Sequence, residues 1–124
     1  MLRQVGFWVP SFGFMAAVWF LSDVVSSETP ELLSDKLLHF LAYALFGLVN
    51  LRAFHRGFRE PLPWATVGAL LLTVGFGAID EWRQSGVSFR DASAADWIAD
   101  LAGGVAGWVI YGIVSRRQAR TRRR

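Results

Sequence analysis

The sequence predicts an all-α membrane protein, a bundle of four transmembrane helices with both termini in the cytoplasm. Hydrophobic residues make up 53% of the 124 residues and charged residues 19%, and the mean hydropathy is +0.34. A chain this short forms one domain and cannot bury that much apolar surface within itself in water. In addition, four apolar stretches follow one another along the chain, and basic and acidic residues fall on alternate connections between them.

The four predicted spans cover approximately residues 4–22, 34–53, 61–80 and 96–115, within a single domain of residues 1–124. A helix of 19 residues measures roughly 28 Å, about the thickness of the hydrocarbon core. The second apolar stretch is shorter, so its charged flanks, Lys36 and Arg52, are expected to extend outward to the interface. Helices are predicted because lipid offers no partner for a free backbone amide. The alternative has three spans, with the fourth segment on the membrane surface.

The distribution of charge predicts which side is cytoplasmic. Ten of the 13 basic residues lie before the first span, between the second and third, or after the fourth, and three lie on the other side. That other side carries eight of the ten acidic residues. Basic connections remain in the cytoplasm, so both termini are expected there. The basic tail, 116–124, follows a span directly, so its expected partner is anionic lipid and not nucleic acid.

Polar residues gather in the outer halves of the predicted spans. In the second span three of them recur at every fourth position and therefore share one helical face. Others stand at the outer end of the third span, in the outer loop, and at two positions four residues apart in the fourth. Together they predict one outward-facing, ligand-binding pocket, formed by Asp35, Lys36, His39, Tyr43, Glu81, Gln84, Arg90, Ser93, Asp96 and Asp100.

Two of these acidic residues, Glu81 and Asp100, are energetically unfavourable as anions at their predicted positions. Glu81 ends a helix, where the helix dipole disfavours an anion, and its expected cationic partners are Arg83 and Arg90. Asp100 lies one turn inside the membrane, where an unpaired acid costs about 3 kcal/mol. A lock to Lys36 or His39 on the second span would offset that cost.

Other polar and small residues also have structural interpretations. Ser93-Ala94-Ala95-Asp96 is a capping-box pattern, and Asp35 stands in a first helical turn, where the dipole favours an acid. Gly103 and Gly107 form a small-xxx-small pattern. That pattern predicts close helix packing, either inside the bundle or in a homodimer.

No cofactor and no metal ion is predicted. The chain has no cysteine, no nucleotide-binding loop, no HExxH motif and no nucleophile elbow. A metal ion would have to use His39 together with Glu81, Asp96 or Asp100. No spacing motif supports such a site.

Three blocks of sequence resemble the VanZ-like family. Residues 35–43, DKLLHFLAY, are similar to its DKxxHFxxY signature, and residues 80–84, DEWRQ, to its DExxQ-type block. Residues 90–103, RDASAADWIADLAG, are similar to its R-x-x-S-x-x-D-x-x-x-[DN]-x-x-G block. The blocks occur in the family's order over nearly the whole chain. Arg83 departs from the His of many members, and Ser88-Phe89 departs from their Pro-Gly.

The resemblance implies a four-helix protein of the bacterial cytoplasmic (inner) membrane with a role in the cell envelope. The family's namesake is linked to reduced susceptibility to the glycopeptide teicoplanin. We therefore expect the pocket to bind an envelope lipid, a lipid-linked cell-wall precursor, or a glycopeptide that recognises one. One alternative is an intramembrane enzyme acting on an envelope lipid, with His39 as the base and Glu81 or Asp100 as the acid. Another is a structural or small-transporter bundle.

Overall fold

The chain folds into four helices in a computed structural model that describes residues 2–28, 35–86 and 94–124. For residues 2–3, 21–28, 35 and 84 it describes the backbone but not the side chains. The helices are α1 (Leu2–Glu28), α2 (Asp35–Phe54), α3 (Pro63–Gln84) and α4 (Ala94–Arg122). The predicted all-α fold is confirmed.

Three of these helices are long and apolar enough to cross a membrane: Lys36–Phe54, Pro63–Arg83 and Ala94–Arg122. The apolar part of α1 among the described side chains, Gln4–Phe20, is shorter. The alternative that laid the fourth segment on the membrane surface is not supported, because α4 is one of the three long helices and packs along α2.

Three of the helices, α1, α3 and α4, are longer than the spans predicted for them, whereas α2 has the predicted length of 20 residues. The basic tail, for example, continues α4 as far as Arg122. The predicted ranges cover only the residues expected in the hydrocarbon core of the membrane. A helix extends beyond that core wherever the residues favour helical structure. Arg, Gln and Ala, which dominate residues 116–120, are strong helix formers in water and at the interface.

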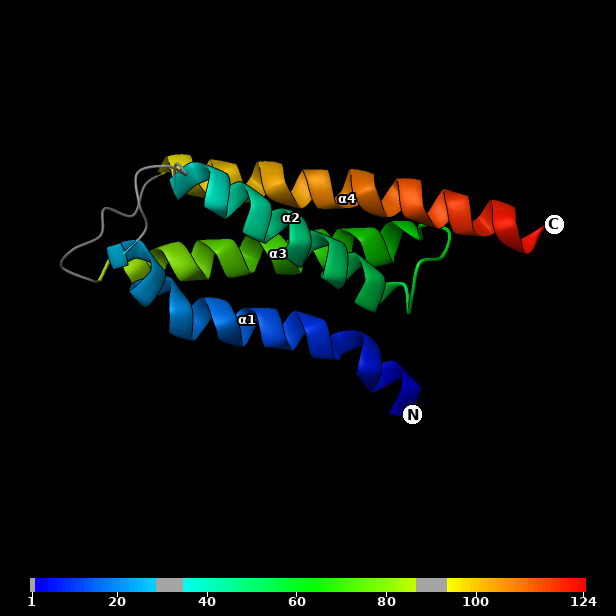
Figure 1. The fold of residues 1–124 in the computed structure, drawn as a ribbon, viewed down its shortest axis with the longest axis horizontal. Coiled ribbons are helices and arrows are strands. Elements are labelled where there is room, and N and C mark those ends of the chain that lie inside the picture. Colours follow the sequence, from blue (N-terminus) through cyan, green and yellow to red (C-terminus); the bar gives the residue numbers. More distant parts are fainter. Residues whose placement is uncertain (1, 29–34, 87–93) are drawn as a thin grey trace.

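The helices alternate in direction along the bundle (Figure 1). The two chain termini and the connection between α2 and α3 lie at one end, and the beginnings of α2 and α4 lie at the other. At the first end Arg123 pairs with Glu60 at 3.5 Å. The ten basic residues that the sequence assigned to one side therefore belong to the end that carries the termini.

The bundle is apolar outside and partly polar inside. Large side chains such as Phe20, Leu71 and Trp82 are exposed, while Asn50 and Thr73 are fully buried. Asn50 Nδ2 donates to Thr73 Oγ1 at 3.0 Å, and that hydroxyl donates to the Ala69 carbonyl at 2.8 Å, while Asn50 Oδ1 has no hydrogen-bond partner among the described residues. An exterior this apolar is the surface expected where lipid, and not water, surrounds the helices.

Glycines let α2 and α4 pack with their backbones in contact. A Cβ atom at Gly107 would lie 2.5 Å from the carbonyl oxygen of Ala44, and one at Gly103 would meet the carbonyl oxygen of Phe40. On the other helix, a Cβ at Gly47 would lie 3.1 Å from the carbonyl oxygen of Gly104. The small-xxx-small pattern thus serves packing inside the bundle, and a homodimer through Gly103 and Gly107 would require α2 to move away.

An aromatic core joins α1, α2 and α3. Phe46 is at its centre, with its ring stacked on Phe14 at a centroid distance of 4.6 Å. Tyr43 and Phe76 contact the same ring edge-on at 5.9 and 5.4 Å. Edge-to-face and offset contacts of this kind are favourable beyond the area that they bury.

Tyr111 holds the connection between α2 and α3 against α4. The chain leaves α2 through Arg56 and Gly57, whose φ angles of 55° and 116° lie in the left-handed region. The Tyr111 hydroxyl accepts from the Arg59 amide at 3.1 Å, and the carbonyl oxygens of Arg59 and Gly57 lie within reach of its proton at 2.9 and 3.1 Å. This hydroxyl satisfies backbone groups that the turn leaves without helical partners.

We expect Tyr111→Phe to lower the free energy of unfolding by about 1–2 kcal/mol, because the Arg59 amide loses its acceptor. The chain offers a matched control in Tyr43→Phe. The Tyr43 hydroxyl makes no hydrogen bond within the described part of the chain, so its loss should leave stability unchanged. Denaturation in detergent, followed by tryptophan fluorescence, measures both. Equal stability of Tyr111→Phe and wild type would contradict the role given to this hydroxyl.

Candidate functional site

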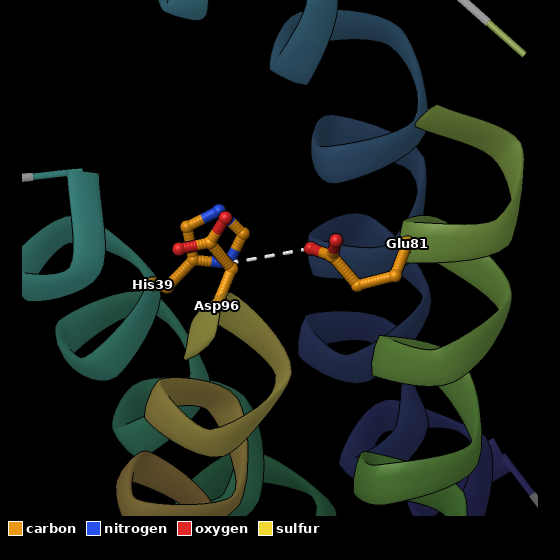
Figure 2. Close-up of side chains that lie close together, drawn as sticks. All are labelled: His39, Glu81 and Asp96. Atoms are coloured by element: carbon orange, nitrogen blue, oxygen red, sulfur yellow. Dashed lines mark ion pairs between the residues drawn. The ribbon is translucent and has the colours of Figure 1, made fainter. Parts of the chain in front are cut away.

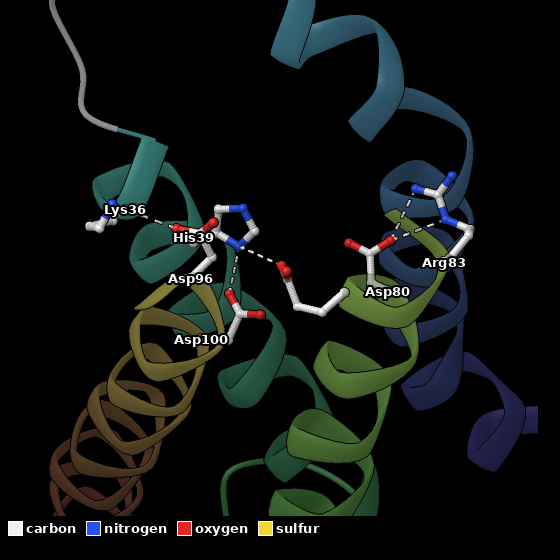
Figure 3. Close-up of polar contacts among 7 residues, drawn as sticks. Lys36, His39, Asp80, Arg83, Asp96 and Asp100 are labelled. Atoms are coloured by element: carbon white, nitrogen blue, oxygen red, sulfur yellow. Dashed lines mark hydrogen bonds and ion pairs between the residues drawn. The ribbon is translucent and has the colours of Figure 1, made fainter. Parts of the chain in front are cut away.

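A group of ionisable side chains lies at the end of the bundle opposite the chain termini (Figure 3). We call Lys36, His39, Glu81, Asp96 and Asp100 the polar cluster. The first two come from α2, Glu81 from α3, and the last two from the first turns of α4. The glycine contact between Gly103 and α2 brings Asp100, one turn before it, level with His39.

The shortest contact in the polar cluster joins α2 to α4. His39 Nδ1 lies 2.8 Å from Asp100 Oδ1, and the two side chains are 9% and 2% exposed. An ionised carboxylate only accepts, so the ring nitrogen donates. Of the two partners that the sequence offered for Asp100, Lys36 and His39, the structure has His39, and this contact fixes the orientation of the imidazole ring.

Glu81 faces the same imidazole ring from α3. Its Oε1 atom lies 3.9 Å from His39 Nδ1, which is too far for a hydrogen bond. Neither of its carboxylate oxygens makes a hydrogen bond within the described ranges, although its side chain is only 12% exposed. A carboxylate in this position needs a cation or a hydrogen-bond donor.

The expectation that Arg83 pairs with Glu81 was wrong. Arg83 binds Asp80 instead, with Nη2 and Nε at 3.1 and 3.3 Å from Asp80 Oδ1, and its guanidinium lies over the Trp19 ring at 5.1 Å. Positions three apart share a helical face, whereas Glu81 is turned by about 100° toward the bundle axis. Asp80 is buried, although it was not among the predicted pocket residues. Its spacing from Arg83 is the signal that could have identified the pair.

Lys36 interacts with Asp96, and the sequence had offered it as a partner for Asp100. Its Nζ atom lies 3.9 Å from Asp96 Oδ1, and its side chain is 61% exposed. A pair at this distance with an exposed lysine contributes little to stability. Lys36 therefore lies at the mouth of the polar cluster and is far more exposed than its carboxylates.

Tyr43 lies deepest on the α2 face that carries His39. Two ring atoms, Cε1 and Cζ, lie 3.1 and 3.4 Å from the point where Gly77 would carry a Cβ. Asp100 Oδ2 lies 3.1 Å from the same point, so the hydroxyl end of the Tyr43 ring and this oxygen both lie beside Gly77. Neither the hydroxyl nor Asp100 Oδ2 has a hydrogen-bond partner within residues 36–83 and 94–124.

Several predicted pocket residues fall outside this description. Arg90 and Ser93 lie outside the described residues, so the expected pairing of Arg90 with Glu81 is not tested. Asp35 begins α2 and Gln84 ends α3, but their side chains are not described. The structure brings together Lys36, His39, Tyr43, Glu81, Asp96 and Asp100 from the predicted set.

The described cluster is acidic. Three carboxylates, Glu81, Asp96 and Asp100, face one imidazole, with one lysine at the rim. Such a set can accept hydrogen bonds from hydroxyl or ammonium groups, bind a cation, or use the imidazole held by Asp100 as a proton acceptor.

Comparisons with known proteins agree with this architecture. Searches of curated proteins and of solved structures found no significant match. A family model described as VanZ/LLP1 matches residues 3–115, which is nearly the whole chain. Given this match and its long apolar helices, the chain is a multi-pass membrane protein that belongs to the VanZ/LLP1 family.

Proposed function

We propose that this protein binds the polar head group of an envelope lipid, or of a lipid-linked cell-wall precursor, in the polar cluster. One observation carries the proposal: three buried carboxylate oxygens, both of Glu81 and Oδ2 of Asp100, lack hydrogen-bond donors among the described side chains, at one end of an apolar bundle. Hydroxyl or ammonium groups of a lipid head group would supply those donors while its acyl chains stay in the membrane.

The proposed setting is the bacterial cytoplasmic membrane, with the polar cluster facing outward. The bundle end that carries the termini also carries ten of the 13 basic residues, which favours a cytoplasmic location for that end. Lys36 at the rim, together with Arg90 from the sequence between α3 and α4, would contact a phosphate or carboxylate of the ligand. A protein that holds a cell-wall precursor in this way would change susceptibility to glycopeptides of the teicoplanin kind.

Mass spectrometry of lipids that copurify in mild detergent tests this proposal. Wild type should retain a lipid at a fixed ratio per chain, and Glu81→Gln should retain about tenfold less, since a hydrogen bond to a charged group is lost. Glu60→Gln is the matched control, because Glu60 is exposed at the opposite end and pairs only loosely with Arg123. Equal lipid retention by wild type and Glu81→Gln would refute the proposal.

The 2.8 Å contact between His39 and Asp100 supports a second candidate, an intramembrane enzyme acting on an envelope lipid. A carboxylate that orients an imidazole is the usual arrangement of a histidine general base. Here His39 would be the base and Glu81 the acid, and Asp100 would position the ring. Products would then accumulate when lipid phosphates or glycolipids are incubated with wild type, but not with His39→Ala.

A structural or small-transporter bundle is the remaining candidate. In that case the polar cluster serves to hold the helices together. Substitutions at Glu81 would then lower the melting temperature in detergent without changing which lipids copurify.

A further inference from the structure

We propose that the polar cluster binds one divalent transition-metal ion, with a ring nitrogen of His39 and carboxylate oxygens of Glu81 and Asp96 as ligands (Figure 2). This inference goes beyond head-group binding and does not depend on it. It also departs from the sequence expectation, which included no metal because no spacing motif supports one.

The geometry already suits a metal ion. One ligand atom from each of the three residues lies within 4.8 Å of the other two. In metal sites with bonds of about 2.0–2.5 Å, ligand atoms on opposite sides of the ion are about 4–5 Å apart. The three residues come from α2, α3 and α4, so small rotations of their side chains can close the set without moving a helix.

The chemistry of the donors indicates the class of ion. One imidazole nitrogen and two carboxylate oxygens form a mixed set that suits Mn²⁺, Fe²⁺ or Zn²⁺, whereas Ca²⁺ and Mg²⁺ prefer oxygen ligands alone. Nδ1 of His39 donates to Asp100 at 2.8 Å, so the metal ligand would be Nε2. A carboxylate that accepts from the other ring nitrogen orients a metal-binding histidine and raises its basicity.

Charge and hydrogen bonding point the same way. Three buried or half-buried carboxylates lie together, and Lys36, the described cation nearest to them, is 61% exposed. Two further polar atoms, Asp100 Oδ2 and the Tyr43 hydroxyl, belong to side chains that are 2% exposed and have no hydrogen-bond partner in the described part of the chain. Asp100 Oδ2 and the ring that carries the hydroxyl both lie beside Gly77. A dication with its bound water would neutralise the carboxylates and supply partners to both atoms.

Titration with Mn²⁺ tests the inference on the full chain. Protein purified in detergent is stripped with a chelator, and unbound Mn²⁺ is then followed by electron paramagnetic resonance. We expect one saturable site per chain, from which Zn²⁺ displaces Mn²⁺. Glu81→Gln and Asp96→Asn should each weaken binding by at least about tenfold, as loss of a metal-site group does, and Glu60→Gln should not.

The two histidines of the chain allow the nitrogen ligand to be assigned. Both ring nitrogens of His55 are engaged at the other end of the bundle, by the Leu51 carbonyl at 2.8 Å and the Leu62 amide at 3.0 Å. Electron spin-echo modulation from a ring nitrogen should therefore accompany bound Mn²⁺ in wild type and in His55→Gln, and disappear in His39→Gln.

Two results would overturn the inference: no saturable site in wild type, or unchanged Mn²⁺ affinity in both carboxylate variants. Melting curves from tryptophan fluorescence identify any variant that does not fold. If Glu81→Gln does not fold, Asp96→Asn is compared with wild type instead, because the Asp96 side chain lies nearer the rim of the polar cluster. Lipid analysis of chelator-treated protein separates the two proposals. If lipid is retained but no metal site is found, only this inference is refuted. If metal binds but no lipid is retained, only the proposed function is refuted.

Discussion

A single methyl group at Gly103 is expected to lower the stability of the bundle sharply. In Gly103→Ala the new Cβ would meet the carbonyl oxygen of Phe40 and lie 2.9 Å from the Ala44 amide nitrogen. Both are backbone atoms of α2 that cannot rotate aside, so the helices must separate. We expect a loss of about 3 kcal/mol, the upper end of the usual effect of overpacking. The separation would also break the contact between His39 and Asp100.

Gly112→Ala is the matched control for this change. Gly112 lies on the same helix, and nothing stands within 4 Å of the position that its Cβ would occupy. Alanine is favoured over glycine inside a helix by about 1 kcal/mol, so this variant should be at least as stable as wild type. Circular dichroism during thermal unfolding in detergent measures both variants. If they unfold at the same temperature, the close packing of α2 on α4 is wrong.

Phe46→Ala is expected to have the second large effect. Phe46 is fully buried between Phe14, Tyr43 and Phe76, so its removal leaves a cavity where three helices meet. In a membrane the lost energy comes mainly from packing contacts, because lipid is as apolar as the protein core. We expect a loss of about 2–4 kcal/mol.

Leu45→Ala supplies the comparison for the aromatic core. Leu45 is the preceding residue on α2 and is 54% exposed, so its truncation should change stability by less than about 0.5 kcal/mol. Hydrogen exchange should show where Phe46→Ala acts. The amides of α1 should exchange faster, because the stacking of Phe14 on Phe46 is lost, while those of α4 should change less. Equal protection of α1 in both variants would contradict this account.

The helices could be predicted because their signals are local. An apolar stretch of membrane-spanning length and the charges that flank it are read directly along the chain, and they identified all four elements. Helix ends were missed because hydropathy identifies the residues that lie in the hydrocarbon core and not the ends of the helices. The continuation of α4 to Arg122 is an example. The shared face of His39 and Tyr43 was equally local, since it follows from a spacing of four residues.

The partners of the polar residues were less predictable. Arg83 is close to Glu81 in sequence, yet it binds Asp80 because helical geometry puts those two on one face. The lock between His39 and Asp100 was one of two alternatives, and the choice depends on how far α4 is shifted along α2. Glycine contacts set that shift, and they become visible only when both helices are in place. The hydroxyl of Tyr111, 52 residues from Arg59, gave no sequence signal at all.

The contact between His39 and Asp100 bears on how the chain is assembled during synthesis. The ribosome makes α2 before α4. His39 is therefore already in the bilayer when Asp100 leaves the translocon. An isolated helix with an aspartate one turn inside would be a poor substrate for insertion. If α4 docks onto α2 as it is inserted, the Asp100 carboxylate is not exposed to acyl chains. The same pair of residues then serves both insertion and the stability of the mature fold.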